Sequence, residues 1–276
     1  MNNSTFSHIV AKSVRLLLCV SMFLSYESIF AAPSTSPEEI ARRNFDVTRF
    51  EDSHSILVFE MISKSGTVRR LAAVTWTKLQ KNSVDNSRLV RFTEPSDIKG
   101  TATLTVEHLD GDDDIWINLP ALGKVRRILA NNKKDSFVGT DFSYGDIIGY
   151  RAEQWNHVVT GTATVDGIEC WILESKPKSS VIADQSGLSK RVTWVRTDNY
   201  VSVKIEGYDS SGRILKRFVQ KNIQLVDKVK ERWQPMRVEA ENVQTEHRTV
   251  AIISEFKTNL GLKDSLFSAR SLDAEK

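Results

Sequence analysis

The sequence has few cysteines, no common catalytic signature and no apolar run long enough to cross a bilayer. Only two of its 276 residues are cysteines, Cys19 and Cys170. The longest apolar run, at residues 16–24, is too short for a membrane span, which needs about 20 apolar residues. A disulfide-stapled scaffold is therefore excluded, and Cys170, in a predicted strand, is expected to be buried and inert. Stability must come from the burial of apolar side chains.

Motifs of the common hydrolases, metalloproteases and nucleotide-binding proteins are also missing. There is no Gly-x-Ser-x-Gly, no His-Glu-x-x-His, no P-loop and no paired-cysteine metal pattern. Residues 175–178 match Ser-x-x-Lys, but the companion motifs of that enzyme class are absent. The acidic run at residues 110–114 lacks the spacing and the distal glutamate of a calcium loop, so we interpret it as a solvated hairpin turn. We expect no catalytic activity, no cofactor and no metal.

The first 32 residues have the features of a secretory signal peptide. Lys12 and Arg15 precede the apolar residues 16–24, and small residues suited to cleavage follow at residues 31–32. Removing this segment lowers the formal net charge from +3 to +2, because two basic residues and one acidic residue are lost. A nearly balanced charge gives no indication of nucleic acid as a partner. We expect an exported, periplasmic protein with a single domain over residues 33–276.

Most of the remaining chain alternates apolar and polar residues with the period of two that is typical of β-strands. Leu57, Phe59 and Met61 share one face of the first strand. Asp166-Gly167 is the strongest hairpin signal, between predicted strands at residues 157–165 and 168–176. In all, about a dozen strands are predicted at hairpin spacing, without the strand–helix alternation of a parallel sheet. An antiparallel meander is therefore predicted.

Few helices accompany these strands. Residues 36–39 have the pattern of a capping box, which predicts a helix over about residues 37–50. Asp141 is a candidate N-cap for a second, short helix or ordered loop near residues 140–149. Residues 179–189 are predicted to be a loop.

A sheet with this many strands twists and curls. The predicted fold class is therefore mainly β with a few helices: an incomplete, strongly curved antiparallel β-barrel, or half-barrel, with helices covering its open side. A few short helices seldom fill such a concave face completely, so we expect an apolar cavity beneath them. A completely packed core would give the same sequence pattern.

Two runs near the middle of the chain carry a family resemblance. Residues 116–128 read Trp-Ile-Asn-Leu-Pro-Ala-Leu-Gly-Lys-Val-Arg-Arg-Ile, and residues 139–147 read Gly-Thr-Asp-Phe-Ser-Tyr-Gly-Asp-Ile. With Phe-Thr-Glu-Pro at 92–95, Trp-Gln-Pro at 233–235 and Leu-Phe-Ser-Ala-Arg at 266–270, they resemble the LolA-like family of periplasmic outer-membrane lipoprotein-sorting proteins.

The likeness spans about residues 37–272, nearly all of the chain that follows the predicted signal peptide. Gly145 stands where the family often has Glu, and Thr140 where Ser is usual. The resemblance implies the same half-barrel with an apolar cavity, which agrees with the fold expected from the strand pattern.

The resemblance also implies a function. A protein of this kind binds a lipid, a lipoprotein acyl chain or another hydrophobic molecule in its cavity and transfers it toward the outer membrane. Its expected partners are an inner-membrane exporter of the resistance-nodulation-division (RND) type or an outer-membrane acceptor. A second hypothesis is a non-carrying periplasmic adaptor with a filled core, and a third is an enzyme that uses the cavity. The volume of the cavity distinguishes the first two hypotheses. The sequence does not indicate the oligomeric state.

Eleven residues are candidates for contact with a ligand. They are Leu57, Phe59, Met61, Phe92, Leu104, Trp116, Leu119, Arg126, Arg127, Phe142 and Tyr144. Arg126 and Arg127 are consecutive on a strand and point to opposite faces, so one of them can reach a head-group phosphate at the cavity mouth. The alternative for this pair is an internal ion pair with Asp141 or Asp146. Phe142 and Tyr144 form either a movable lid over the cavity or part of a packed core.

Overall fold

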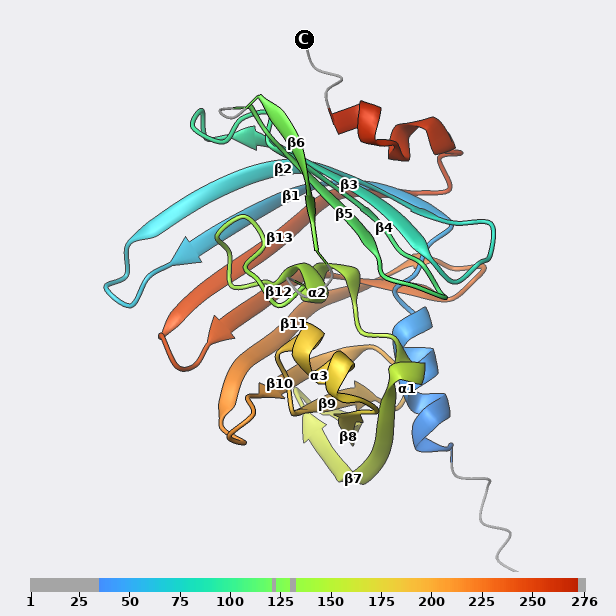
Figure 1. The fold of residues 1–276 in the computed structure, drawn as a ribbon. Coiled ribbons are helices and arrows are strands. Elements are labelled where there is room, and N and C mark those ends of the chain that lie inside the picture. Colours follow the sequence, from blue (N-terminus) through green and yellow to red (C-terminus); the bar gives the residue numbers. More distant parts are fainter. Residues whose placement is uncertain (1–34, 121–122, 130–132, 273–276) are drawn as a thin grey trace, which may run out of the picture. The chain divides into compact units, whose positions relative to one another are not determined.

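The computed structural model describes residues 35–120, 123–129 and 133–272 (Figure 1). The predicted signal peptide lies outside these ranges. The described residues belong to one compact unit, Thr35–Lys276. Within these described ranges no helix is long and apolar enough to be a candidate membrane span.

One antiparallel sheet of 13 strands makes up most of the described chain. Its strand order is β6-β5-β4-β3-β2-β1-β13-β12-β11-β10-β9-β8-β7. Consecutive strands are therefore neighbours in the sheet except for β6 and β7, and β1 also pairs with β13. The strands are β1 (Asp52–Ile62), β2 (Val68–Leu79), β3 (Asn86–Glu94), β4 (Ala102–Val106), β5 (Asp114–Leu119), β6 (Lys124–Ile128), β7 (Trp155–Val165), β8 (Ile168–Pro177), β9 (Lys190–Arg196), β10 (Ser202–Tyr208), β11 (Ile214–Asp227), β12 (Arg232–Asn242) and β13 (His247–Thr258). The sheet is strongly curved and does not close, since β6 and β7 are its two edges (Figure 1). This confirms the predicted incomplete, curved antiparallel barrel.

The strand pattern in the sequence explains this sheet locally. Asp166 and Gly167 have φ angles of 50° and 79°, as a two-residue hairpin turn requires, and they join β7 to β8 as predicted. On β1, Leu57, Phe59 and Met61 share the concave face, where they pack into the central core cluster. The buried members of this cluster are Phe59, Leu71, Ala73, Val90, Phe92, Ile115, Phe137, Phe142, Tyr144, Ile148, Ala240 and Ala251. Phe59 is only 1% exposed.

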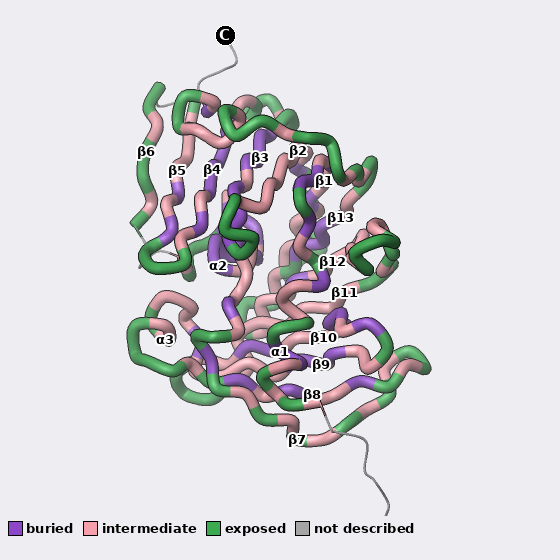
Figure 2. The backbone as a smooth tube through the Cα atoms, turned by 90° about the vertical axis from the view of Figure 1, so that its right-hand side faces the viewer, coloured by how far each residue is buried: buried purple, intermediate pink, exposed green. Residues whose placement is uncertain are grey.

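The connection between the two edge strands crosses the concave side of the sheet, and we call its described residues 133–154 the plug (Figure 1). It contains α2 (Tyr144–Ile148) and the short 3-10 helix η3 (Ala152–Gln154). Figure 2 shows α2 as a buried segment facing the strands. The plug therefore supplies the cover that the open half-barrel needs.

Aromatic side chains join the plug to the sheet. The ring of Phe59 lies 6.2 Å from that of Phe137 and 5.8 Å from that of Phe142, measured between ring centroids. The rings of Phe137 and Tyr144 are 5.4 Å apart. Phe142 and Tyr144 are each 6% exposed and belong to the central core cluster with Phe92.

The predicted cap of α2 was wrong by two residues. Ser143, not Asp141, is the N-cap: its hydroxyl accepts from the backbone N–H of Asp146 at 3.1 Å, and the Asp146 carboxylate accepts from the backbone N–H of Ser143 at 2.8 Å. This is a reciprocal capping box. Asp141 instead accepts hydrogen bonds from β13, 2.6 Å each, through His247 Nδ1 and Thr249 Oγ1.

Two helices differ from their predicted extents. α1 (Pro37–Asp46) begins at the predicted Ser36 cap but ends before Phe50, which packs against Phe256 instead. The predicted loop at residues 179–189 contains α3 (Ser180–Ser186), with Ser179 as N-cap and Gly187 in the left-handed conformation after its last turn. Ser179 and Gly187 are therefore the start and stop signals of a helix that the loop prediction does not include.

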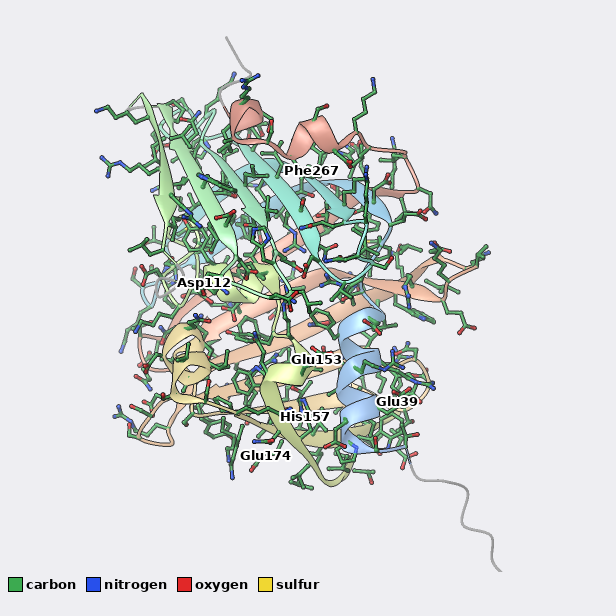
Figure 3. All side chains as sticks on the ribbon, turned by 45° about the vertical axis from the view of Figure 1, so that its right-hand side comes forward. Glu39, Asp112, Glu153, His157, Glu174 and Phe267 are labelled. Atoms are coloured by element: carbon green, nitrogen blue, oxygen red, sulfur yellow. The ribbon has the colours of Figure 1, made fainter. Side chains whose placement is uncertain are left out.

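Helical segments cover both faces of the sheet. On the concave side, Ile40 and Ala41 of α1 pack with Leu173 and Val195 of the β8–β9 region. On the convex side, the 3-10 helices η4 (Asp264–Phe267) and η5 (Ala269–Leu272) pack over β3–β5. Figure 3 shows Phe267 in this outer layer, away from α1 and the plug.

Candidate ligand pocket on the concave face

A pocket of about 400 Å³ lies between α1, the plug and the concave face of the sheet. This volume falls within the range of roughly 300–1,000 Å³ that is typical of small-molecule sites. Phe142, Ile147 and Ile148 of the plug line it, together with Ala41 and Phe45 of α1. This pocket lies beneath the covering helices, and its walls are both polar and apolar.

The apolar floor of the pocket follows from the strand register. Cross-strand partners have side chains on the same face, so each row of partners forms a stripe across the sheet. Three such rows supply the pocket's apolar floor: Leu57 with Ile253; Phe59 with Ala251 and Val238; and Leu173 with Thr193, Ile205 and Phe218. The floor joins residues that are up to about 200 positions apart in the sequence.

A polar row bounds this floor at the β7–β9 end. His157 on β7 is the partner of Ser175 on β8, and Ser175 is the partner of Arg191 on β9. All three residues line the pocket. The next partners are Gly207 and Lys216, so the row continues across β10 and β11. Figure 3 shows His157 on β7, on the side of the sheet that α1 covers.

Hydrogen bonds fix the His157 ring. Its Nε2 lies 2.8 Å from the carbonyl oxygen of Ala152, and its Nδ1 lies 2.8 Å from the hydroxyl of Ser175. A carbonyl can only accept, so Nε2 carries the proton, and in the neutral ring Nδ1 accepts from Ser175. Burial lowers the pKa of His157, which keeps the ring neutral. The pair is therefore held rigidly in the wall.

The plug contacts the same polar row through an ion pair. Lys216 Nζ donates to the Asp146 carboxylate at 2.7 Å, and Tyr150 Oη donates to the other oxygen of Asp146 at 3.0 Å. Burial alone would raise the pKa of Asp146, but the charge and hydrogen bond of Lys216 lower it below its usual range. Burial and the nearby Asp146 raise the pKa of Tyr150 well above its usual range. These contacts hold α2 over the sheet.

A second polar region lies at the α1 and β3 side of the pocket. Arg49 pairs with Glu107 at 3.0 Å, and its guanidinium stacks 4.4 Å from the centre of the Phe45 ring. Arg88, on β3, donates from Nε to Thr77 at 3.3 Å. Burial lowers the pKa of Arg88, which is the effect expected for a cation enclosed by protein.

The predicted ligand-contact residues fall into three groups in the structure. Leu57, Phe59 and Phe142 line the pocket. Met61, Phe92 and Tyr144 lie in or against the central core cluster, outside the pocket lining, and Leu119 lies near the end of β5. Leu104 and Trp116 lie in the convex-face cluster beneath η4 and η5, so their position gives no support to a role in binding.

The two arginines on β6 also lie away from the pocket. Arg126 and Arg127 are exposed, at the sheet edge. The expected ion pair with Asp141 or Asp146 was wrong, because Arg127 pairs with Asp114 and those two aspartates have His247 and Lys216 as partners. Edge position explains the difference, since β6 neighbours only β5.

The acidic run at residues 110–114 is only partly a solvated turn. Asp113 is 5% exposed, accepts from the backbone N–H of His108 at 3.0 Å and pairs with Lys133 of the plug at 2.8 Å. The neighbouring Asp85 pairs with Arg151, also of the plug. These ion pairs fasten both ends of the plug to the strands. Among the described residues no group of three or more potential ligands is arranged to hold a metal ion.

Two charged pocket residues that are not among the predicted contacts share one sequence signal. Arg88 and Arg191 lie in phase with the apolar, inward-facing residues Val90 and Val195 of their own strands. A charged residue at an inward position of a strand is unusual in a well-packed core. That signal identifies the residues as candidates, but only the register between strands brings them into one pocket.

Comparisons with known proteins agree with this architecture. A family model described as that of an uncharacterized protein matches residues 84–274. The structure is similar to that of a DUF1329 family protein from Desulfovibrio piger, with 30% sequence identity, a TM-score of 0.79, and coverage of 86% of this chain and 97% of that chain. The comparison with curated proteins finds no match.

Two further solved structures are similar to this one. A domain from Vibrio parahaemolyticus, described as an outer membrane lipoprotein-sorting protein domain, has 26% identity and a TM-score of 0.78, with 86% of this chain and 97% of that chain covered. A LolA superfamily protein from Nitrosomonas europaea has 19% identity and a TM-score of 0.65, with 86% of this chain and 99% of that chain covered. The similarity to the Nitrosomonas europaea protein concerns the fold alone.

Proposed function

The chain belongs to the LolA-like family, and from this premise we propose that it is a periplasmic carrier of a hydrophobic molecule. Its cargo is a lipid, a lipoprotein acyl chain or another long hydrophobe, which it transfers toward the outer membrane. The observation that carries this proposal is the pocket of about 400 Å³ between the apolar floor of the sheet and the plug.

Burial of the cargo drives uptake. Each methylene group that leaves water for the apolar floor contributes roughly 0.8 kcal/mol, so a long chain gains enough to bind in an enclosed groove. The plug residues Phe142, Ile147 and Ile148 line the side of the pocket that faces the sheet. A hydrocarbon chain bound between them and the sheet is shielded from water. This explains why a carrier needs both the curved sheet and its cover.

Release requires the plug or α1 to move. A partner protein that binds the open form more tightly than the closed form shifts the equilibrium toward release. The partner that we propose is an exporter of the RND type in the inner membrane, or an acceptor at the outer membrane. The ion pairs from the plug to Asp85 and Asp113 are among the contacts that such a movement has to break, as is the ion pair of Asp146 with Lys216.

The pocket also favours a carrier over a non-carrying adaptor. An adaptor with a filled core has no need of a cavity next to Phe142, and the pocket lies at this residue. A carrier is therefore better supported than a non-carrying adaptor.

Native mass spectrometry of the protein purified from a periplasmic extract tests the proposal. We expect a bound species with the mass of a lipid, which organic extraction removes and identifies. The delipidated protein is then expected to bind a fluorescent fatty acid with one-to-one stoichiometry. A purely ligand-free mass, together with no binding of the fluorescent fatty acid, contradicts a carrier function.

A further inference from the structure

Arg191 is a half-buried cation without a carboxylate partner of its own among the described residues. It lines the pocket, and its guanidinium lies 4.3 Å from the centre of the Tyr150 ring. Within the described part of the chain no carboxylate lies within ion-pair distance of it. Asp146 acts electrostatically on Arg191, but its carboxylate is bound to Lys216 at 2.7 Å. Burial lowers the pKa of Arg191, as expected for a charge removed from water.

A second unsatisfied donor lies next to the same ring. Trp155 lines the pocket and is 2% exposed, and its Nε1–H has no hydrogen-bond partner among the described residues. The rings of Trp155 and Tyr150 are 5.7 Å apart, so Tyr150 contacts both Trp155 and Arg191. An unpaired buried donor is unfavourable because it has lost its hydrogen bonds to water. A bound acceptor with negative charge satisfies this donor and pairs with the guanidinium of Arg191.

Apolar residues lie beside these donors. The row that contains Leu173, Ile205 and Phe218 is displaced by two residues along the strands from the row of Arg191, and it lines the same pocket. A ligand that reaches both rows has one acidic end and one hydrocarbon part.

We propose that the pocket selects an amphiphile with an acidic group, a carboxylate or a phosphate, bound by Arg191 and the Nε1–H of Trp155. Its hydrocarbon part lies along Leu173, Ile205 and Phe218. The planar guanidinium presents paired donors that match the two oxygens of such a group. This inference rests on the proposed carrier function and specifies the class of its cargo.

Arg88 provides a matched control. It is also half-buried, lines the pocket and lies on the concave face, but its Nε donates a hydrogen bond to Thr77 at 3.3 Å. One donor of Arg88 is therefore already used within the chain. Arg88→Gln and Arg191→Gln make the same chemical change at two sites in one pocket.

The test measures displacement of a neutral pyrene-labelled hydrocarbon from the delipidated mature protein. Competitors are oleate, oleyl alcohol and inorganic phosphate, which separate the acidic group from the chain. For the wild type we expect oleate to bind roughly tenfold or more tightly than oleyl alcohol, because a charge-assisted hydrogen bond to a carboxylate is stronger than one to a neutral hydroxyl. Arg191→Gln is expected to lower the affinity for oleate until it equals the affinity for oleyl alcohol. Arg88→Gln is expected to keep the preference for oleate over oleyl alcohol.

Thermal unfolding checks that each variant is folded. Should Arg191→Gln fail to fold, Arg191→Lys decides: it keeps the charge but loses the paired donors, so the preference for oleate is expected to fall without vanishing. An unchanged preference in the folded Arg191 variant, or its loss in Arg88→Gln, overturns the inference. So does displacement by inorganic phosphate as effective as that by oleate, which indicates a site for a free anion.

The two proposals fail in different ways in this experiment. If neither the pyrene probe nor any amphiphile binds to the wild type, the carrier function fails, and the inference fails with it. If oleate and oleyl alcohol bind equally well, the carrier function stands and only the acidic-group site is contradicted.

Discussion

Arg88 and Arg191 lie on the inward side of their strands, in phase with the buried Val90 and Val195. Apolar side chains at such positions give a filled core, and polar ones leave room and charge inside the barrel. The character of this pocket therefore depends on single residues in otherwise ordinary strands. Phe59, by contrast, is an apolar residue at an inward position, and it both contacts the plug and lines the pocket.

Replacing Phe59 with alanine tests the core at the residue scale. Phe59 is 1% exposed and packs against three aromatic rings, of Phe92, Phe137 and Phe142. Phe59→Ala is expected to lower the free energy of unfolding by about 3–5 kcal/mol, measured by urea unfolding followed by tryptophan fluorescence. The control Val229→Ala changes a side chain that is 92% exposed and is expected to cost less than about 0.5 kcal/mol. Equal costs contradict the central position of Phe59.

The buried ion pair of Asp146 predicts a pH dependence. Its pKa in the folded protein is lowered, so its contribution is present above its unfolded pKa and is lost as the pH falls through the folded value. Asp146→Asn leaves Lys216 without its carboxylate and is expected to destabilise by roughly 3–5 kcal/mol at pH 7. Urea unfolding at pH 7, 5 and 3 is expected to show this difference shrinking below about pH 4, where the wild type loses the same contribution.

Asp184→Asn is the matched control for this series. Asp184 is an exposed carboxylate on α3, so the variant is expected to follow the wild type within about 0.5 kcal/mol at each pH. A difference between Asp146→Asn and the wild type that stays constant from pH 7 to 3 contradicts the assigned ion pair.

At the scale of elements, the plug has two structural roles. Its aromatic side chains fill the open side of the half-barrel, and its residues form the wall of the pocket opposite the sheet. α2 has only five residues, so its own backbone hydrogen bonds stabilise it little. Its geometry depends on the Ser143 cap and on the ion pair of Asp146 with Lys216.

Ser143→Ala is expected to loosen α2 without unfolding the sheet. Loss of an N-cap hydroxyl costs about 1 kcal/mol, so hydrogen exchange by mass spectrometry is expected to show faster exchange in residues 144–149. Ser179→Ala removes the equivalent cap of α3, where the hydroxyl accepts from Ile182 at 3.3 Å. That control is expected to raise exchange in α3 and leave α2 unchanged. Identical exchange of α2 in the wild type and Ser143→Ala contradicts the role of the cap.

How much of this could be predicted differs between fold and site. Strand alternation and turn residues such as Asp166-Gly167 act locally, so the sheet was predictable from short windows. The helix α3 was missed because its cap signals, Ser179 and Gly187, lie in a polar stretch with little apolar periodicity. The pocket was only partly predictable, because the row of His157, Ser175 and Arg191 exists only once β7, β8 and β9 are in register.

At the scale of the whole described unit, the chain builds a half-barrel whose two edges are joined by its own cover. β6 and β7 are consecutive in the sequence but lie at opposite edges of the sheet, and the plug crosses the concave side between them (Figure 1). Pairing of β1 with β13 joins the two meanders at the centre. A pocket under the plug follows from this topology, because a short irregular segment with one five-residue helix does not fill the curved face.

Neighbouring positions on β13 allow a direct test of this pocket. Ile253 lines it, whereas Ile252 points to the opposite face of the same strand. Ile253→Trp fills the pocket, and Ile252→Trp adds the same bulk outside it.

Titration of the delipidated wild type, Ile252→Trp and Ile253→Trp with a fluorescent fatty acid is the measurement that tests the carrier account most directly. We expect one molecule bound per chain to the wild type and to Ile252→Trp, and an affinity at least about tenfold weaker for Ile253→Trp, equal to about 1.4 kcal/mol. Equal affinity of all three folded proteins, or no binding to the wild type, contradicts a cargo site under the plug.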